Sequence, residues 1–526
     1  MLSSLPLTNP VAAADTTVSG ASSIVLPGSY KIVLHAVPTN NSSPWAITID
    51  PHGLVWFLEE HSNKLGSYDT QSGVFHEYPI PTPMATPQAV TTDGSGNVWF
   101  TELTSSKLAE LVHGSSGIVE YSIPSLPVSL GSETEQLNCG PGALIWDPTG
   151  TIWFACLFSN QIDEYFPQSG TFETFNLPYF PSGPAGLILD GKGNLWFTAA
   201  DSNMLGKAVV SQLRNGTSEG IDEFPPINQT YIFSFNEATS FLGASTIVRT
   251  SLPTPSGIAL DPAGRLWVTE HVDSSFDSYN PTTGSLDRYW TSQTHGAYGF
   301  SVSFPNGIAV GKDGTVWVAE HYGNKVAEFD PASGALIEYS ASCCSSSYGG
   351  VYTLALAPDG TPWFVEVQGN AIGELVPSTN SSTITVTMPT AATITGASDT
   401  IVLPLIFSGS GSPVNLTLGV SGVSETGALS NLTARFPTTS IIVSSGSPAD
   451  SDLTLSSANL KPGVYDLTIT ASDSDQSISY SAILRLTVTG GEAYPYLLPV
   501  AVGGAVVVAV AAAVYLRVSR AKKRRR

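Results

Sequence analysis

Charged residues are scarce in this chain, and basic residues are the scarcest. Only 12% of the 526 residues are charged, against about 25% in average soluble proteins. Seven of the 21 basic residues stand in the last ten positions, which leaves 14 basic against 43 acidic residues upstream. Such a surface repels nucleic acid and anionic lipid and suits cations or cationic partners. The alternative is an acidic surface that only keeps the protein soluble in a salty or acidic medium.

Familiar catalytic signatures are also missing. The sequence contains no G-x-S-x-G, no Walker loop, no CxxC and no HExxH. These patterns belong to nucleophilic hydrolases, nucleotide-binding proteins, redox proteins and zinc proteases. The sequence therefore carries none of the commoner signatures of a hydrolase or of a nucleotide-binding protein.

One long apolar run stands near the C-terminus. Residues 494–516 are uncharged and rich in Val and Ala, and the strongly basic stretch 517–526 follows them. About 20 apolar residues are enough to span a bilayer, and a basic flank stays on the cytoplasmic side. We therefore expect a single transmembrane helix at 494–516, a basic cytoplasmic tail at 517–526, and an N-terminal ectodomain outside the cell membrane.

Two further features agree with export. Residues 1–14 end in VAAA, which fits a small-residue cleavage site, although the apolar region before it is short and lacks a basic residue. We interpret this segment as a truncated signal peptide. Asn-x-Ser/Thr triplets, which also arise by chance in Ser/Thr-rich chains, lie only before the apolar run and are candidate glycosylation sites. They are Asn41 (or its neighbour Asn40), Asn215, Asn228, Asn380, Asn415 and Asn431.

Seven tryptophans mark seven copies of one unit. In most copies an apolar strand opened by Pro is followed by a Gly turn, a second strand around the Trp, and two further strands. A four-stranded unit that repeats every 43 to 50 residues or so is the mark of a β-propeller. We expect a seven-bladed β-propeller at 30–376, in which residues 30–38 supply the missing fourth strand of the last blade and close the ring. The marker residues are Trp56, Trp99, Trp153, Trp196, Trp267, Trp317 and Trp363.

The segment 377–491 has a different texture. Ser, Thr and Val dominate it, it contains no Trp, and its short segments alternate between apolar and polar residues. This pattern is typical of an immunoglobulin-like β-sandwich, which would form a stalk between the propeller and the membrane. The expected fold class is therefore all-β, with a seven-bladed propeller followed by a sandwich and a C-terminal transmembrane helix.

Extra chain length is concentrated on one face of the predicted propeller. In an antiparallel blade, the connection between strands two and three and the link to the next blade share a face, and the other two turns lie opposite. Long loops on a rigid scaffold commonly carry binding and chemistry. The alternative is shielding of a glycosylated surface. The inserted segments are 124–140, 208–253, 291–304 and 340–351.

The fourth position after the marker Trp holds candidate ligands. It is Glu60, His271 or His321 in three units and apolar in the other four. Two imidazoles from consecutive blades with a carboxylate nearby could hold Zn²⁺ or another divalent ion. The alternative is a set of hydrogen-bonded polar residues at a rim. A Glu one position earlier recurs in five units, and we interpret that repeated acid as structural.

The four cysteines suit an oxidising compartment. Cys139 precedes the first strand of the third unit and Cys156 ends its second strand, so both lie at the same rim and a disulfide between them is expected. Cys343 and Cys344 are adjacent in a Ser-rich loop. They could form a vicinal disulfide, pair elsewhere, bind a soft metal or stay free.

The repeat P-x-G-I-A…DG-x-[IVL]-W-[FV]-T-E…N-K-[IVL]-x-E-[FY] resembles that of the streptogramin (virginiamycin B) lyase family over roughly residues 30–376. The resemblance implies a seven-bladed propeller and, in the lyases, a Mg²⁺-dependent elimination that opens a cyclic depsipeptide antibiotic. The lyases' catalytic His, second His and metal-binding Glu correspond to Tyr352, Asn306 and Val367. All three depart from the lyase pattern, so the resemblance implies the fold without the chemistry.

A second, shorter resemblance concerns Asn306. The segment PNG at Pro305 is similar to that of gluconolactonase/regucalcin propellers, in which the Asn binds a divalent metal, so Mg²⁺, Ca²⁺ or Zn²⁺ is a possible cofactor. Asn before Gly is also common in turns.

Three functions follow as hypotheses. The first is a membrane-anchored recognition or adhesion protein whose partner is an extracellular ligand, a glycan or an envelope protein. The second is a metal-dependent lyase or lactonase on the same face with Glu60, His271, Asn306 and His321 as candidates; Tyr352 is a further metal or ligand candidate. The third is a structural envelope component.

Overall fold

In the residues that the computed structural model describes, the chain is all-β apart from one short helix. The structure describes residues 17–26, 30–130, 133–179, 181–215, 220–224, 254–272, 274–291, 303–341, 350–378, 383–394, 400–410, 413–424, 432–457, 463–473 and 478–489. The predicted signal peptide, the apolar run 494–516, the basic tail and the pair Cys343 and Cys344 lie outside these residues.

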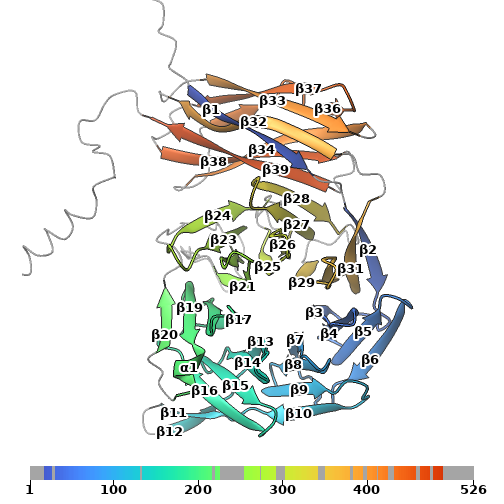
Figure 1. Cartoon of the computed structure of the whole chain (residues 1–526), viewed down its shortest axis with the longest axis vertical. Helices are drawn as coiled ribbons and strands as arrows, with labels where there is room; N and C mark the ends of the chain where they lie inside the picture. The colour runs from blue at the N-terminus through green and yellow to red at the C-terminus, as the bar shows by residue number, and fades with distance from the viewer. Residues whose placement is uncertain are drawn as a thin grey trace, which may run out of the picture.

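Within the described residues, seven antiparallel four-stranded units surround a central opening (Figure 1). Blade 1 is β3 (Pro44–Ile49), β4 (Leu54–Glu59), β5 (Lys64–Asp69) and β6 (Val74–Pro79). Blade 2 is β7 (Pro87–Thr92), β8 (Val98–Glu102), β9 (Lys107–Leu111) and β10 (Ile118–Ser122). Blade 3 is β13 (Pro141–Asp147), β14 (Thr151–Cys156), β15 (Gln161–Phe166) and β16 (Thr171–Asn176). Blade 4 is β17 (Pro184–Leu189), β18 (Asn194–Ala199), β19 (Met204–Val209) and β20 (Ile221–Phe224).

The remaining blades follow the same plan. Blade 5 is β21 (Pro255–Leu260), β22 (Leu266–Glu270), β23 (Ser275–Tyr279) and β24 (Leu286–Trp290). Blade 6 is β25 (Pro305–Val310), β26 (Val316–Glu320), β27 (Lys325–Asp330) and β28 (Ala335–Ser340). Blade 7 is β29 (Val351–Leu356), β30 (Pro362–Glu366), β31 (Ala371–Pro377) and the N-terminal strand β2 (Tyr30–Ala36). The first strand of each blade contacts that of the next, and β29 contacts β3, so the ring is closed.

A recurring Asp and the marker Trp hold the first hairpin of blades 1, 2, 4 and 5. In blade 1 the Trp56 indole N–H donates to Asp50 at 3.2 Å, while the other Asp50 oxygen accepts backbone N–H groups of the turn. Blades 2, 4 and 5 repeat this bond at 3.1 to 3.2 Å. One carboxylate thus satisfies both a turn and a buried indole, which explains the fixed spacing between the two residues.

Two elements interrupt the regular blades. A hairpin of β11 (Leu126–Leu130) and β12 (Glu133–Leu137) occupies the link between blades 2 and 3. The helix α1 (Val210–Leu213) follows β19, and Arg214 behind it binds Glu164 and Asp147 of blade 3. In blade 3, therefore, Asp147 pairs with an arginine instead of the blade's tryptophan.

The C-terminal strands form a second β-rich unit beside blade 6 (Figure 1). They are β32 (Thr383–Ile394), β33 (Thr400–Ser410), β34 (Val414–Ser424), β35 (Leu432–Arg435), β36 (Ser440–Val443), β37 (Ala449–Ser457), β38 (Gly463–Asp473) and β39 (Ile478–Val488). The N-terminal strand β1 (Thr17–Leu26) joins them by pairing with β32. Residues 17–26, to which the sequence analysis assigned no structure, thus belong with the C-terminal unit.

The propeller and the C-terminal unit share a sheet and a core. Strand β39 pairs with β28 from Leu336↔Ser481 to Tyr339↔Ile478, which adds a strand to the outer edge of blade 6. Beneath this junction the Tyr30 ring makes edge contacts with Trp317 and Tyr339 at 5.6 and 5.8 Å. One apolar cluster runs from these residues into the C-terminal strands. Burial of a common core makes the two parts one structural body.

Ile337 tests that coupling. It is 2% exposed under β39, whereas Val119, at the equivalent place on the outer strand of blade 2, is 46% exposed. We expect Ile337→Ala to lower the free energy of unfolding by about 2 to 4 kcal/mol, as buried large-to-small changes do. Val119→Ala should cost within about 0.5 kcal/mol, as exposed positions do. Denaturant titration of both variants measures this, and equal losses would show that β39 does not bury the edge of blade 6.

Candidate functional site

The five candidate site residues lie at one end of the propeller. The connections between strands two and three and the links between blades meet at this end, here called the loop-rich end; the opposite end is called the tight-turn end. Asn306 and Tyr352 are the second residues of the inner strands β25 and β29. Glu60, His271 and His321 directly follow the second strands β4, β22 and β26. All five are partly buried.

Two residues that the sequence analysis did not single out complete the group. Trp45 and Gln88 are the second residues of the inner strands β3 and β7. The Trp45 ring lies 3.9 Å from the Tyr352 ring, and its indole N–H donates to Gln88 Oε1 at 3.1 Å. These seven residues are called the mouth cluster below: Trp45, Glu60, Gln88, His271, Asn306, His321 and Tyr352.

Contacts between blades connect the cluster. Asn306 Nδ2 donates to the Tyr352 carbonyl at 3.3 Å, and its Oδ1 accepts from Ser256 Oγ at 2.7 Å. The His321 ring meets Tyr352 edge to face at 4.8 Å and stacks beside His271 at 6.1 Å. The cluster therefore spans blades 5, 6, 7, 1 and 2 in an unbroken sequence.

The scaffold fixes the backbone beneath these side chains. Thr269 Oγ1 of blade 5 donates to the Asn306 carbonyl, and Thr353 Oγ1 of blade 7 donates to the Trp45 carbonyl, at 2.8 and 2.9 Å. Because each bond crosses from one blade to the next, the inner strands are held in register at the mouth. Such preformed placement is typical of binding sites on rigid β-scaffolds.

Both imidazoles are uncharged at neutral pH. Burial lowers the pKa of His271, and burial together with the neighbouring His271 lowers the pKa of His321 to about 4. His271 Nδ1 lies 3.2 Å from the Pro305 carbonyl, which can only accept, so Nδ1 carries the proton and Nε2 keeps a lone pair. Among the described residues, no group bonds His321 Nδ1.

The acidic members are held toward their neutral forms. Burial raises the pKa of Glu60, which lies beside Gln88, and burial together with Glu60 raises the pKa of Tyr352 to about 12. At pH 7 the cluster therefore presents neutral imidazoles, amides, a phenol and an indole, with Glu60 as its single acid.

The two histidines do not form a metal site in this arrangement. Zinc binds imidazole nitrogens at about 2.0 to 2.1 Å, so both lone pairs must converge on one point. The rings of His271 and His321 lie nearly parallel, 22° apart, with centroids 6.1 Å apart. In the part of the chain that the structure describes, neither belongs to a group of three potential ligands within reach of one ion.

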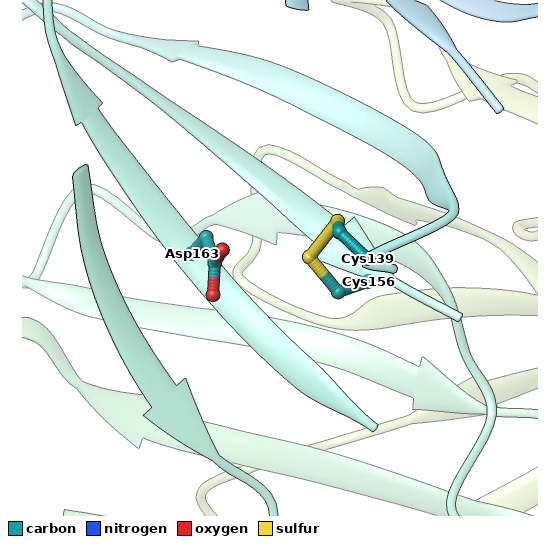
Figure 2. Close-up of side chains that lie close together, drawn as sticks. All are labelled: Cys139, Cys156 and Asp163. Atoms are coloured by element: carbon teal, nitrogen blue, oxygen red, sulfur yellow. A yellow bond between two sulfur atoms is a disulfide. The ribbon is translucent and has the colours of Figure 1, made fainter. Parts of the chain in front are cut away.

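The one such group among the described residues is Cys139, Cys156 and Asp163. Figure 2 shows the two sulfur atoms joined to each other, with an S–S distance of 2.03 Å. A disulfide offers no thiolate to a metal, so the two cysteines form a covalent link and not a metal site. It ties the start of blade 3 to the end of its second strand, at the loop-rich end. Closing such a loop stabilises a fold by about 3 kcal/mol.

Asp163 beside the disulfide forms no ion pair with any residue that the structure describes. It is 2% exposed, and burial raises the pKa of its carboxyl to about 7. Asp277 occupies the equivalent position in blade 5, where both oxygens accept from Arg288 at 2.8 Å. The residue opposite Asp163 is Thr174 instead. The blade scaffold therefore tolerates an uncompensated acid here.

The repeated Glu after the marker Trp is part of the scaffold. Glu59 accepts from Ser62 Oγ at 2.7 Å and Glu102 from Ser105 Oγ at 2.6 Å, in the turn that follows each strand. Burial raises the pKa of both carboxyls to about 7. The structure thus places these acids in the blade interior, one residue before the position that varies at the mouth.

Taken together, the geometry is that of a β-propeller with a preformed, nearly uncharged cluster at its loop-rich end. The virginiamycin B lyase family matches residues 22–130. Among solved structures, a streptogramin B lyase aligns with a TM-score of 0.53 at 24% identity, covering 66% of this chain and 98% of that one. The virginiamycin B lyase of Staphylococcus aureus aligns with a TM-score of 0.52 at 22% identity, covering 66% and 99%.

A catalytically inactive histidine-to-alanine variant of the same Staphylococcus aureus enzyme, with quinupristin, aligns with a TM-score of 0.51 at 22% identity, covering 66% and 99%. No curated protein matches the chain. The propeller is therefore virginiamycin B lyase-like, and these identities speak for the fold alone.

The residues at the lyase positions do not fit the magnesium that the resemblance implies. Val367, at the position of the metal-binding Glu, has no oxygen in its side chain, and its backbone N–H donates to the Gly350 carbonyl. Tyr352 replaces the catalytic imidazole and stacks on Trp45. Mg²⁺ requires oxygen ligands, usually carboxylates, so we derive no metal-dependent step from this site.

The buried acids predict a pH-dependent stability. Acids with a folded pKa near 7 favour the folded state fully below their unfolded pKa of about 4, and that contribution is lost as pH rises through about 7. Glu59, Glu102, Asp163 and Glu328 all behave in this way. His321 acts oppositely, but only below its unfolded pKa of about 6.5. We expect the melting temperature to rise when the pH falls from 8 to 6.5.

The matched control is Asp163→Asn. It should raise stability at pH 8 by about 1 kcal/mol or more, since it removes a buried charge, and should reduce the difference between pH 8 and pH 6.5. Asp277→Asn should destabilise instead, because it removes the buried carboxylate to which Arg288 donates two hydrogen bonds. A melting temperature that falls between pH 8 and pH 6.5 would contradict the interpretation.

Proposed function

We propose that this protein is a cell-surface recognition or adhesion module whose propeller binds an extracellular ligand at its loop-rich end. The observation that carries the proposal is the mouth cluster, in which aromatic, amide and imidazole side chains from five consecutive blades meet at the central opening. Convergent aromatic and polar groups on a rigid scaffold are typical of ligand sites.

Exposed apolar side chains also favour a binding site at the loop-rich end. Met84, Phe158 and Tyr179 are 82%, 55% and 51% exposed, and all three lie in loops of the loop-rich end. In the described part of the propeller, the other large apolar side chains that are exposed are the smaller Val74, Val112 and Val119. Exposed Met and aromatic residues that gather on one face are characteristic of binding surfaces.

The chain direction favours display of this end away from the membrane. Strand β28 runs from the tight-turn end to the loop-rich end, and β39 pairs with it antiparallel. Beyond its last pairing at Ser481, β39 continues to Val488, about 23 Å at the rise of a strand. The chain therefore leaves the propeller on the tight-turn side, six residues before the predicted span 494–516 begins.

Membrane anchoring is part of the proposal. No helix among the described residues is long and apolar enough to cross a membrane, and the predicted span lies outside them. We propose that 494–516 spans the membrane with 517–526 in the cytoplasm, and that 1–14 directs export. Asn41, Asn215 and Asn415 are exposed, as glycosylation requires, while the other three candidates lie outside the described residues.

The C-terminal unit would serve as the mount of the propeller. Burial alternates along β33, so one of its faces packs against the core. Its row β39–β32–β33–β37 and the pair β34–β38 fit the proposed immunoglobulin-like sandwich. Because β1 pairs with β32 of this unit and β39 of this unit pairs with β28 of blade 6, the mount would be rigid.

Enzymatic action is a second candidate because of one observation at His271. Its Nδ1–H is bonded to a carbonyl and its Nε2 lone pair remains, which is the arrangement of a general base. This candidate requires opening of a lactone or cyclic ester by the full chain and loss of that turnover in His271→Ala. Intact substrate after incubation with and without Mg²⁺, Ca²⁺ or Zn²⁺ would remove it.

The recognition proposal is tested by adhesion. The full chain, immobilised on beads, should retain cells or isolated envelopes of its source, and Trp45→Ala should reduce retention at least about tenfold, as loss of a central aromatic anchor does. The control is Trp146→Ala, which truncates a partly buried tryptophan at the tight-turn end of β13. Equal retention by both variants and the parent chain would refute a site at the mouth.

A further inference from the structure

The mouth cluster has an aromatic floor. The centroids of Trp45 and Tyr352 lie 3.9 Å apart with the ring planes 35° apart, so nothing fits between the rings and only the ring surfaces turned away from this contact are open to a ligand. Both are partly exposed, unlike the seven marker tryptophans, each of which is buried. A flat, electron-rich ring face attracts the slightly positive hydrogens of C–H groups. This surface therefore suits a ligand with a flat face of C–H groups.

Polar groups that both donate and accept surround this floor. Gln88 and Asn306 carry amides, and each already uses its oxygen to accept a bond from within the protein. The His321 ring stands edge-on to Tyr352, and its Nδ1 is without a hydrogen-bond partner among the described residues. Amides and neutral imidazoles match hydroxyl groups, because a hydroxyl also donates and accepts.

Charge narrows the ligand further. Neither histidine is charged at neutral pH, because burial lowers the pKa of both. The described residues of the mouth cluster therefore offer no cation to bind a phosphate, sulfate or carboxylate group. The whole chain carries a formal charge of −22, which also repels anions. A neutral ligand needs no cation at the site and is not repelled by the negative charge of the chain.

The other half of the ring is different. The same inner-strand position is Gly142 in blade 3 and Ala185 in blade 4, and the position after the second strand is Leu157 or Ala200. These side chains offer no hydrogen bonds. Among the described residues, the polar and aromatic side chains of the mouth therefore lie on one arc, from blade 5 through blade 7 to blade 2.

We infer that this arc is a binding site for a neutral saccharide, with one sugar ring packed on Trp45 and hydroxyls bonded to Gln88, Asn306 and His321. A sugar ring presents C–H groups on its faces and hydroxyls around its edge, which is the pattern of this site. The inference rests on the proposed recognition function and names its ligand class.

The test uses the full chain and defined probes. Neutral oligosaccharides of glucose, mannose, galactose and N-acetylglucosamine are immobilised beside acidic oligogalacturonate, and binding is then quantified by calorimetry. We expect binding to at least one neutral probe and none to oligogalacturonate. Trp45→Ala should weaken binding at least about tenfold. Trp45→Phe, which keeps a flat ring, should retain more affinity, and Trp146→Ala should bind like the parent chain.

The outcomes separate this inference from the proposed function. Binding that survives Trp45→Ala, or a preference for oligogalacturonate, overturns the saccharide site. If envelope adhesion depends on Trp45 but no neutral probe binds, the recognition function stands and the saccharide assignment falls. If neither adhesion nor binding occurs, both fall. Circular dichroism and thermal melting of each variant verify that a loss reflects the site and not the fold.

Discussion

Closure of the ring is the interaction on which the rest of the structure depends. Strand β2 from the N-terminus pairs with β31 of the last blade over seven positions, from Tyr30↔Pro377 to Ala36↔Ala371. The Asn370 amide then donates to the carbonyls of Val37 and Thr39. The pairing of β2 with β31 covers the edge of β31 that would otherwise be open. Closure also brings Trp45 of the first blade against Tyr352 of the last, so the aromatic floor of the mouth exists only in the closed ring.

The blades could be predicted from sequence because what holds each one together is local. The Asp50–Trp56 bond joins residues six positions apart, and it recurs in blades 2, 4 and 5, whereas in blade 3 Asp147 binds Arg214 instead of Trp153. The pairing of β28 with β39 could not be predicted in this way. His76, Val119 and Ile337 occupy the same place in three outer strands, and only Ile337 is buried. An exposed valine at this position shows that an apolar residue does not reveal a covered edge.

The candidate site could be predicted from sequence only in part, through residues that depart from the repeat. His271 and His321 stand out because they depart from a repeated column, and the structure places them side by side. Trp45 is the second residue of its inner strand, a position that differs in every blade, and its importance comes from a contact with Tyr352 more than 300 positions away. Likewise, Asp163 and Asp277 occupy the same position in their blades but face different residues on the neighbouring strand. Asp277 faces Arg288, whose positive charge balances the carboxylate, whereas Asp163 faces Thr174, which carries no charge.

The three departures from the lyase pattern have a common chemical effect. Replacement of two histidines and a carboxylate by Asn306, Tyr352 and Val367 removes metal ligands and bases from the inner ring, and it adds an aromatic surface and an amide. The imidazoles that remain are His271 and His321, one step outward, and burial keeps them neutral. The scaffold of a lyase-like propeller is thus retained while the residues at these three positions differ from the lyase pattern.

The attachment of the propeller agrees with the proposed recognition function. Strand β39 is the last described strand before the predicted membrane span, and it is also hydrogen-bonded to blade 6, which carries Asn306 and His321. A ligand that pulls on the mouth would therefore load the ladder between β28 and β39 along the strands. Under such a load the hydrogen bonds, which lie across the strands, share the force instead of breaking one after another. An adhesion module mounted through a flexible tether would lack this resistance, so the shared sheet is the feature of the fold that best suits the proposed function.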